Sequence, residues 1–294
     1  MSTSVAAFEE CLEPAQALAR ELGTACEPVA VHRFPDGESL VRVNGKAGTA
    51  ILYRSLDDPN AKIVELLLAA SALRDGGARR VVLVTPYLAY MRQDVAFHPG
   101  EAVSQKVIGH LIAGHFDGLV TFDAHLHRIA RLGEAVPGIA AINLSAAPVL
   151  SLAIEPAERP VLVGPDSESR QWVEAIASPH GLDVLVGEKH RQGDRDVEIA
   201  IPGIEGVAGR TAILVDDVIS SGMTMIAAAR LLREAGAAKV EALATHCLAG
   251  PDDLAAIRSA GVARIRSAQT VRNETACLPV AGLLAQAIRE QGWL

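Results

Sequence analysis

An acidic pair followed by a loop of small residues is the first segment whose residue types suggest chemistry. Asp216 and Asp217 follow the apolar run 211–215, and a helix-forming segment begins near Thr224. The loop between them offers hydroxyl groups and a glycine, and the side chains available to a ligand there are those of Ser220, Ser221, Gly222 and Thr224. Backbone N–H groups at a helix N-terminus bind anions, and small residues let a phosphate approach the backbone.

Two carboxylates at the end of a strand can also hold the vicinal hydroxyls of a sugar. A ribose 5-phosphate would satisfy both the carboxylates and the anion-binding loop. The alternative is a capped helix after a turn, with Asp216 and Asp217 merely solvated.

A second polar segment places two cations at alternate positions. Lys189 and Arg191 lie within residues 187–198, a stretch rich in both signs of charge. In an extended strand, these two side chains point to the same face. Such cations can neutralise charge that develops on a transferring phosphoryl group. The segment is either a catalytic lid or a solvated hairpin, and the two interpretations are compatible because a lid must also be soluble and mobile.

The first half of the chain contains a turn with an aromatic and two acidic side chains. Phe34, Asp36 and Glu38 surround Gly37. A phenylalanine ring can stack on adenine, while carboxylates accept hydrogen bonds from its exocyclic amine. Taken alone, this pattern favours an ordinary Pro-Asp-Gly turn between two strands.

Two further segments of the first half follow expected strands. Arg92, Gln93 and Asp94 come after the turn at residue 86, and an arginine there could pair bidentately with phosphate oxygens. The alternative is a charged surface turn. His125, two residues after Asp123, could bind a cation or contact a triphosphate, although more than half of such pairs are structural.

Short β-branched runs alternate with Ala- and Leu-rich stretches along the chain. The runs predict strands over residues 49–53, 80–85, 118–122, 160–163, 183–186, 212–215 and 240–245. The other stretches predict helices over residues 14–21, 61–75, 102–114, 169–177, 224–235, 252–260 and 280–291. Continuous apolar strands that alternate with helices are typical of parallel sheets covered on both faces, so we predict an α/β fold. Ligands of such sheets bind at the carboxyl ends of the strands.

An internal repeat indicates two domains. The sequence Thr-Ala-Ile-Leu occurs at residues 49–52 and again at 211–214, and each copy is followed by a similar helix–Gly–Ala–basic–strand pattern. A duplication predicts two similar α/β domains, residues 1–145 and 146–294. The alternative is that this pattern is common to α/β proteins in general and indicates no duplication. Only the second copy continues into an acidic pair and a hydroxyl-rich loop, so we expect the chemistry to concentrate there.

Composition excludes several classes of protein. The chain has 294 residues, of which 50% are hydrophobic and 21% charged, so a sizeable core can form. A formal net charge of −8 and 3% aromatic residues disfavour general nucleic-acid binding. The apolar runs are far shorter than the ~20 residues that span a bilayer. Four scattered cysteines without a CxxC pair, and no secretory signal, lead us to expect a cytoplasmic protein with reduced thiols.

The loop 215–224 resembles the 5-phosphoribosyl-binding loop of type I phosphoribosyltransferases. Other segments make the chain similar to the ribose-phosphate pyrophosphokinase (phosphoribosyl-pyrophosphate synthetase) family, and to its short archaeal-type members in particular. These segments, in order, are RFPDGE at 33–38, PYLAYMRQD at 86–94, GEAVS at 100–104, DAH at 123–125, GPD at 164–166, KHR at 189–191 and ATH at 244–246. The resemblance covers nearly the whole chain and implies two tandem type I phosphoribosyltransferase-like domains.

The resemblance also implies roles for the residues named above. ATP would be bound by Phe34, Asp36, Glu38, Arg92, Gln93 and Asp94, and His125 and Asp166 would help to place Mg²⁺. Ribose 5-phosphate would be bound by Asp216, Asp217, Ser220, Ser221, Gly222 and Thr224, with Lys189, Arg191 and His125 as catalytic residues. In the family, the loop that corresponds to the turn at Phe34 reaches the nucleotide of a neighbouring subunit, so the resemblance implies a homo-oligomer.

The activity implied is transfer of the diphosphoryl group of MgATP to the C1 hydroxyl of ribose 5-phosphate. Two alternatives stay open: a phosphoribosyltransferase that consumes the product, and a non-catalytic regulatory paralogue. The signatures of P-loop kinases, dinucleotide-binding sites and α/β-hydrolases are absent from the sequence.

Overall fold

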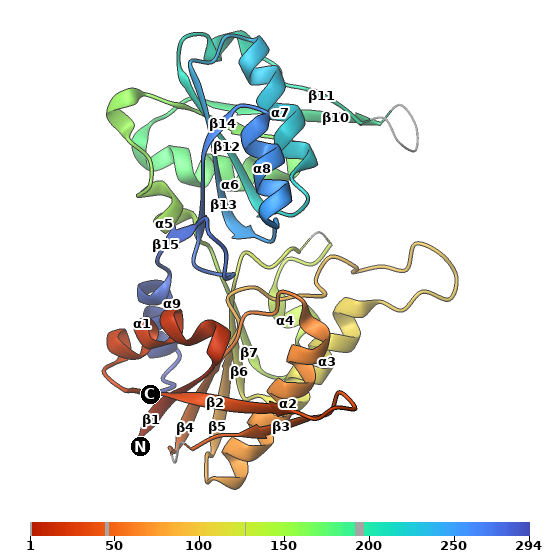
Figure 1. Ribbon diagram of the computed structural model, residues 1–294, viewed down its shortest axis with the longest axis vertical. Helices are drawn as coiled ribbons and strands as arrows, with labels where there is room; N and C mark the ends of the chain where they lie inside the picture. The colour runs from red at the N-terminus through yellow and green to blue at the C-terminus, as the bar shows by residue number, and fades with distance from the viewer. Residues whose placement is uncertain (1, 45–46, 127, 192–196) are drawn as a thin grey trace. The chain divides into compact units, whose positions relative to one another are not determined.

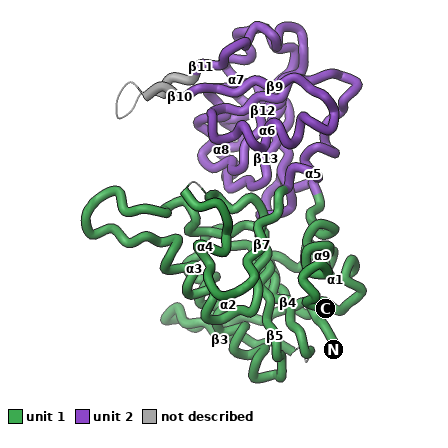
Figure 2. The backbone as a smooth tube through the Cα atoms, turned by 180° about the vertical axis from the view of Figure 1, so that it is seen from behind, with its two compact units in different colours: residues 1–145, 279–294 green, residues 146–278 purple. Residues whose placement is uncertain are grey.

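The chain folds into two compact units, which are described separately below (Figure 2). The computed structural model describes residues 2–44, 47–126, 128–191 and 197–294, and for residues 189–191 and 197–199 it describes the backbone alone. Unit 1 comprises Met1–Ser145 and Pro279–Leu294, and unit 2 comprises Ala146–Leu278.

Unit 1 is built on a seven-stranded sheet with the strand order β3-β2-β1-β4-β5-β6-β7 (Figure 1). The strands are β1 (Thr3–Phe8), β2 (Ala25–Arg33), β3 (Ser39–Arg42), β4 (Thr49–Tyr53), β5 (Arg80–Val84), β6 (Gly118–Phe122) and β7 (Ala140–Leu144). All neighbouring pairs are parallel except β2 and β3, which form an antiparallel hairpin at the edge. The expectation of parallel sheets therefore needs this correction at one edge.

The helices of unit 1 are α1 (Leu12–Leu22), α2 (Pro59–Asp75), α3 (Ser104–His115), α4 (Leu132–Ala135) and α9 (Ala281–Glu290). The last of these belongs to unit 1, whereas the expected boundaries assigned residues 279–294 to the second domain. Tertiary contacts explain the difference. Helix α9 packs on α1, and the backbone carbonyl of Gly292 accepts a hydrogen bond from Arg80 Nη1 at 3.2 Å. The Trp293 ring also fills the space beside Gly118, where a Cβ would lie 2.5 Å from the indole.

Unit 2 contains a six-stranded parallel sheet with the order β15-β14-β13-β12-β8-β9. Its strands are β8 (Val161–Gly164), β9 (Val184–Val186), β12 (Thr211–Ile219), β13 (Lys239–Cys247), β14 (Val262–Ala268) and β15 (Ala276–Leu278). A separate antiparallel hairpin consists of β10 (Glu188–Arg191) and β11 (Val197–Ala200). The helices are α5 (Ala147–Ser151), α6 (Arg170–Ala177), α7 (Met223–Glu234) and α8 (Pro251–Ser259).

Alternation along the strands decides which face of the unit 2 sheet is covered by which helices. Ala212, Leu214 and Ala242 form one core cluster with Ala228 of α7 and Ile257 of α8. Because successive side chains of a strand point to opposite faces, Ile213 of β12 and Glu241 of β13 lie on the other face.

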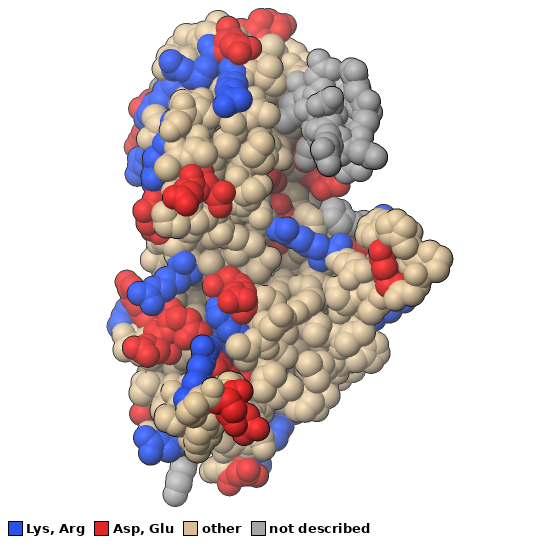
Figure 3. All heavy atoms as spheres, turned by 45° about the vertical axis from the view of Figure 1, so that its right-hand side comes forward, with Lys and Arg blue, Asp and Glu red and all other residues tan. Residues whose placement is uncertain are grey.

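Charged side chains of both signs are interspersed over the surface seen in Figure 3, as the modest formal net charge of −8 would suggest. Among the described residues, no helix is long and apolar enough to cross a membrane.

Candidate functional site

The acidic pair lies on β12 itself, at the carboxyl end of a central strand. The expected strand ended at residue 215, but β12 continues to Ile219 because Val218 and Ile219 still pair with His246 and Cys247 of β13. Asp217 is 5% exposed, and its backbone N–H donates to Asp216 Oδ1 at 3.0 Å. The two carboxylates are therefore fixed by the sheet and not by a mobile loop.

A third carboxylate contributes to the electrostatics of this edge. Asp166 follows β8, which is the parallel neighbour of β12. Its Oδ1 accepts hydrogen bonds from the backbone N–H groups of Glu168 at 3.1 Å and Ser169 at 3.3 Å. Burial, followed by the charges of Asp217 and Asp166, raises the pKa of Asp216 well above its ordinary value. A proton, a cation or a hydrogen-bond donor at this edge would relieve the repulsion.

The loop after β12 requires glycine at Gly222. This residue has φ +73°, and a Cβ there would lie 2.4 Å from Cδ1 of Ile257. Helix α7 begins at the next residue, Met223, so its first N–H groups face the loop. Ser220 and Ser221 are exposed and Thr224 is half-buried. The arrangement combines hydroxyl donors with a helix N-terminus, which suits an anion such as a phosphate.

The two expected lid cations lie on the separate hairpin. Lys189 pairs with Ile199, and Arg191 pairs with Val197, in the antiparallel register of β10 and β11. The alternation puts Lys189 and Arg191 on one face of the strand. Their side chains, and residues 192–196 between the strands, lie outside what the structure describes.

In unit 1, the aromatic turn connects β2 to β3, as the plain interpretation of Pro-Asp-Gly required. The Phe34 N–H donates to the Glu38 carbonyl at 2.8 Å, and Asp36 Oδ1 accepts from the Glu38 N–H at 3.1 Å. Gly37 has φ +93°. The Phe34 side chain is 40% exposed and meets the His32 ring edge-on, with centroids 4.8 Å apart. The phenyl ring is thus accessible to a planar partner.

A buried ion network behind this turn was not predicted from the sequence. Arg54, 3% exposed, pairs with Glu65 Oε2 at 2.7 Å and Glu10 Oε1 at 2.7 Å, and its guanidinium lies 3.7 Å from the centroid of the Phe8 ring. Glu65 Oε1 also accepts from Ser39 Oγ at 3.0 Å. Burial alone would raise the pKa of Glu65, but hydrogen bonds and charge from Arg54 hold it below its ordinary value. The available signal was a lone glutamate within the apolar run of α2.

The segment 92–94 is held against the start of α3. The Gln93 carbonyl accepts from the Gln105 N–H at 3.2 Å, while Arg92 is exposed. The Asp94 side chain is 1% exposed and pairs with Arg128. Asp94 therefore has a structural partner, and Arg92 is the member of this segment that is open to a ligand.

The Asp-x-His segment lies at the carboxyl end of β6. Asp123 has φ +34°, and its backbone N–H donates to the Leu144 carbonyl at 2.8 Å. The Ala124 N–H donates to Asn143 Oδ1 at 2.8 Å. These bonds fix the backbone that carries His125, a half-buried side chain. His125 belongs to unit 1 and Asp166 to unit 2.

Comparison with known proteins relates both units to one enzyme family. Residues 3–114 match the model described as the N-terminal domain of ribose phosphate pyrophosphokinase, and residues 140–269 match the phosphoribosyl transferase domain. The chain is 34% identical over 289 residues to the ribose-phosphate pyrophosphokinase of Methanopyrus kandleri, covering 97% of this chain and 98% of that protein. It is 37% identical over 229 residues to the enzyme of Thermococcus kodakarensis, covering 77% of this chain and 80% of that protein.

A solved structure of similar fold matches nearly the whole length of this chain. The phosphoribosylpyrophosphate synthetase from Mycobacterium smegmatis superimposes with a TM-score of 0.85 at 26% identity, covering 99% of each chain. The resemblance to short archaeal members is confirmed by the archaeal relatives. The chain belongs to the ribose-phosphate pyrophosphokinase family of transferases, with two tandem α/β units of the phosphoribosyltransferase type.

Proposed function

We propose that this protein transfers the diphosphoryl group of MgATP to the C1 hydroxyl of ribose 5-phosphate. The hydroxyl oxygen attacks the β-phosphorus, the bond from that phosphorus to the α,β-bridging oxygen breaks, and AMP leaves. The hydroxyl proton is released, and the product is 5-phosphoribosyl 1-diphosphate.

The observation that carries the proposal is the carboxyl end of β12. Asp216 and Asp217 offer carboxylates to the ribose hydroxyls. Beyond them, the start of α7 offers an anion site for the 5-phosphate, made by Ser220, Ser221, Gly222 and Thr224. Hydrogen bonds between charged and neutral groups contribute about 1.5–3 kcal/mol each, so the sugar and its phosphate can be held at both ends.

The nucleotide is assigned to unit 1 in this proposal. The exposed Phe34 ring would stack on adenine, Asp36 and Glu38 would accept from its amine, and Arg92 and Gln93 would contact the phosphates. The ion pair of Asp94 with Arg128 supports a positioning role for Asp94. We further propose a homo-oligomer, in which the Phe34 turn of one subunit serves the nucleotide of another.

Catalysis in this proposal rests on positioning and charge neutralisation. Lys189 and Arg191 share one face of β10 and would bring two positive charges to the transferring group. Preorganised positive groups of this kind lower the barrier of phosphoryl transfer because they act where negative charge develops.

The donor chemistry of unit 2 suits a magnesium ion that arrives with the nucleotide. Asp166 adds its charge to a carboxylate edge where the pKa of Asp216 is already raised by burial and by Asp217. Among the described residues, no group of three or more His, Cys, Asp or Glu side chains is arranged to hold a metal. Magnesium commonly takes one or two carboxylates and completes its shell with water and substrate phosphates. Asp166 is the proposed protein ligand in unit 2, and the bound ion would supply charge neutralisation to the polyphosphate.

The test is ³¹P NMR of the purified protein with ribose 5-phosphate, ATP and Mg²⁺. AMP and a sugar 1-diphosphate are expected as the new signals. The Lys189→Ala variant is expected to lose about 10²-fold in rate, the scale of one electrostatic stabiliser. ADP with a sugar bisphosphate would contradict the proposal. Retained binding of both substrates without turnover would favour the regulatory paralogue, and turnover only with a free base and the sugar 1-diphosphate would favour a phosphoribosyltransferase.

A further inference from the structure

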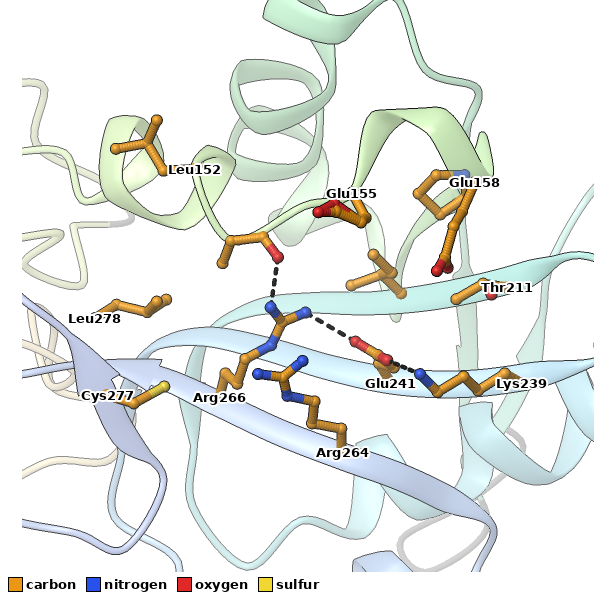
Figure 4. A pocket seen from close by; sticks show the side chains of 13 residues that line it. Leu152, Glu155, Glu158, Thr211, Lys239, Glu241, Arg264, Arg266, Cys277 and Leu278 are labelled. Atoms are coloured by element: carbon orange, nitrogen blue, oxygen red, sulfur yellow. Dashed lines mark hydrogen bonds and ion pairs between the residues drawn. The ribbon is translucent and has the colours of Figure 1, made fainter.

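A polar pocket of about 500 Å³ lies in unit 2, on one face of its sheet (Figure 4). Its floor is formed by alternate residues of three strands: Thr211 and Ile213 of β12, Lys239 and Glu241 of β13, and Arg264 and Arg266 of β14. Five residues separate Thr211 from Asp216 along β12, which is roughly 16 Å at the rise of a strand. The lining of the pocket contains no residue of the segment 216–224 proposed to bind ribose 5-phosphate, although Arg266 lies at the level of Val215 in the register of the sheet.

These floor residues lie on the face of the sheet opposite to α7 and α8. Their neighbours in sequence, Ala212, Ala242 and Ile265, belong to the core under those helices. Alternation then directs Ile213, Glu241 and Arg266 into the pocket, and Figure 4 shows Glu241 and Arg266 facing each other there.

Arg266 is the central cation of the pocket, and two of its three guanidinium nitrogens have protein partners. It is 8% exposed, its Nη1 donates to the Ala153 carbonyl, and its Nη2 pairs with Glu241 Oε2 at 2.8 Å. Lys239 pairs with the other oxygen of Glu241. The Nε atom of Arg266 is buried and has no hydrogen-bond partner among the described residues. An atom so buried is closed to a ligand in the pocket, so Arg266 contributes positive charge to the pocket through its outer guanidinium nitrogens and not through Nε.

Arg264 supplies a second cation on the same face of β14. It is exposed, and the structure shows no hydrogen bond or ion pair for it within the described residues. Residues two apart on a strand are neighbours on one face, so the two guanidinium groups repel each other. An anionic group between them would be held by two positive charges, with the planar guanidinium geometry that suits a carboxylate.

The other wall of the pocket is acidic. Glu155 and Glu158 line it, and neither forms an ion pair within the described residues. Leu152, Pro160 and Leu278 add apolar lining to the same pocket. A ligand that satisfies both walls carries an anion at one end, a cation at the other and an apolar chain between them.

We propose that this pocket is a binding site for a small zwitterion whose carboxylate and ammonium groups are separated by an apolar chain. The carboxylate is bound by Arg264, with the positive charge of Arg266 beside it. The ammonium group faces Glu155 and Glu158. The volume of the pocket is within the range of small-ligand sites, about 300–1,000 Å³.

Cys277 provides a direct readout, because this exposed thiol lines the pocket. The measurement is the rate at which iodoacetamide alkylates Cys277, followed by peptide mass spectrometry, with the half-buried Cys26 of unit 1 as internal control. The probes are 4-aminobutanoate, 6-aminohexanoate and 8-aminooctanoate, compared with hexanoate and hexylamine. A bound probe at ten times its Kd is expected to slow Cys277 alkylation about tenfold and leave Cys26 unchanged.

Two variants test the two ends of the ligand. Arg264→Gln removes an exposed cation without a protein partner, so it is expected to fold and to lose protection by both hexanoate and the amino acids. The double variant Glu155→Gln/Glu158→Gln is expected to keep protection by hexanoate and to lose the advantage of the amino acids over it. Changing Arg266 is less informative, because its pair with Glu241 also supports the fold.

Three outcomes would overturn the proposal. The first is absence of protection by every probe, and the second is equal protection by hexanoate and by the best amino acid. The third is protection that depends on protein concentration without any probe, which would mean that a second copy covers the pocket. Ribose 5-phosphate and ATP are expected to leave Cys277 alkylation unchanged, so failure here is separable from failure of the proposed activity.

Discussion

Strands β4 and β12 begin with the same four residues, Thr-Ala-Ile-Leu, and both lie between parallel neighbours. The charged residues at the ends of the two strands nevertheless have opposite electrostatic surroundings. Counting from the shared start, Arg54 of unit 1 corresponds to Asp216 of unit 2. Arg54 is buried between Glu10 and Glu65, with both contacts at 2.7 Å. Asp216 has acidic neighbours instead, and its pKa is raised by burial, Asp217 and Asp166.

The comparison shows that charge at a strand end does not by itself mark a site. The charge of Arg54 is neutralised within unit 1, so it stabilises the fold. At Asp216, burial and the charges of Asp217 and Asp166 raise the pKa, so a ligand that brings a cation or a hydrogen-bond donor would be stabilised there. Excess charge fixed by a rigid strand separates the candidate site of unit 2 from the structural network of unit 1.

The largest effect is expected when the buried ion pair of Arg54 with Glu65 is broken. Arg54→Met leaves Glu65, which is 1% exposed, buried without its main partner. Removing one partner of a buried ion pair costs about 3–5 kcal/mol, so the free energy of unfolding in urea should fall by that amount. The matched control is Arg74→Met, which breaks an exposed pair with Asp117 at 3.0 Å and should cost about 0–1 kcal/mol. Equal losses would contradict the assigned difference.

Removing a carboxylate at the end of β12 should lower activity without lowering stability. Asp216→Asn and Asp217→Asn each remove a charged partner proposed for a ribose hydroxyl. A loss of about 1.5–3 kcal/mol in transition-state stabilisation, or roughly 10–100-fold in kcat/KM for ribose 5-phosphate, is expected. Asp252→Asn, at an exposed position in the first turn of α8, is the control and should leave kcat/KM unchanged. An unchanged kcat/KM in both site variants would remove the carboxylates from the proposed mechanism.

A smaller effect is expected from Gly222→Ala. The left-handed conformation costs a non-glycine residue roughly 1–2 kcal/mol, and here the new Cβ also meets Ile257. The KM for ribose 5-phosphate should rise, and stability should fall by a similar amount. Gly209→Ala separates the two causes, because Gly209 has φ +70° and nothing within 4 Å of the Cβ position. If the two variants behave alike in both assays, the close approach at Gly222 has no consequence for the loop.

The smallest effect, and one of opposite sign in the two units, is expected in the pH dependence of stability. The pKa of Glu65 is below its ordinary value of 4.5, so its stabilisation is present above that pH and is lost as the pH falls. The pKa of Asp216 is above its ordinary value of 3.8, so its ionisation lowers stability as the pH rises above that value.

Urea unfolding without substrate or Mg²⁺ would measure both signs. Asp216→Asn should be more stable than the parent at neutral pH, and the difference should shrink toward pH 3.8. Glu65→Gln should be less stable at neutral pH, and its difference should shrink as the pH falls below 4.5. Differences of the same sign would mean that the two strand ends are not electrostatic opposites.

The sequence pattern predicted the elements that bury an apolar face. Each expected helix has a counterpart that differs at its ends by a few residues, such as α2 over Pro59–Asp75, and the two-unit α/β fold is confirmed. Some of the strands that escaped prediction lack a continuous apolar run, although β1, with its buried residues 5–8, has one. Strand β2 contains Pro28 and is largely exposed, and β14 carries Arg264 and Arg266 toward the polar pocket.

The site was predictable where its residues are consecutive. The segment from Asp216 to Thr224 and the turn at Phe34 are local patterns. The first spans the end of β12 and the start of α7, and the second connects β2 to β3. The roles given to them stay predictions until the experiments above are made. The partners of Asp94 and Arg54 were not predictable, because Arg128 and Glu10 are 34 and 44 residues away in the chain.

By itself, the sequence determined the α/β fold class, the duplicated strand and the residue types at its two ends, because hydrophobic periodicity and local turn chemistry act over a few neighbouring residues. Only the tertiary structure decided which charges are neutralised. In this structure Arg54 is buried against Glu65, β12 extends through Asp216 because it pairs with β13, and α9 belongs to unit 1. Burial and the distance between charges arise when distant segments pack together, and these quantities separate a structural ion pair from a candidate binding site.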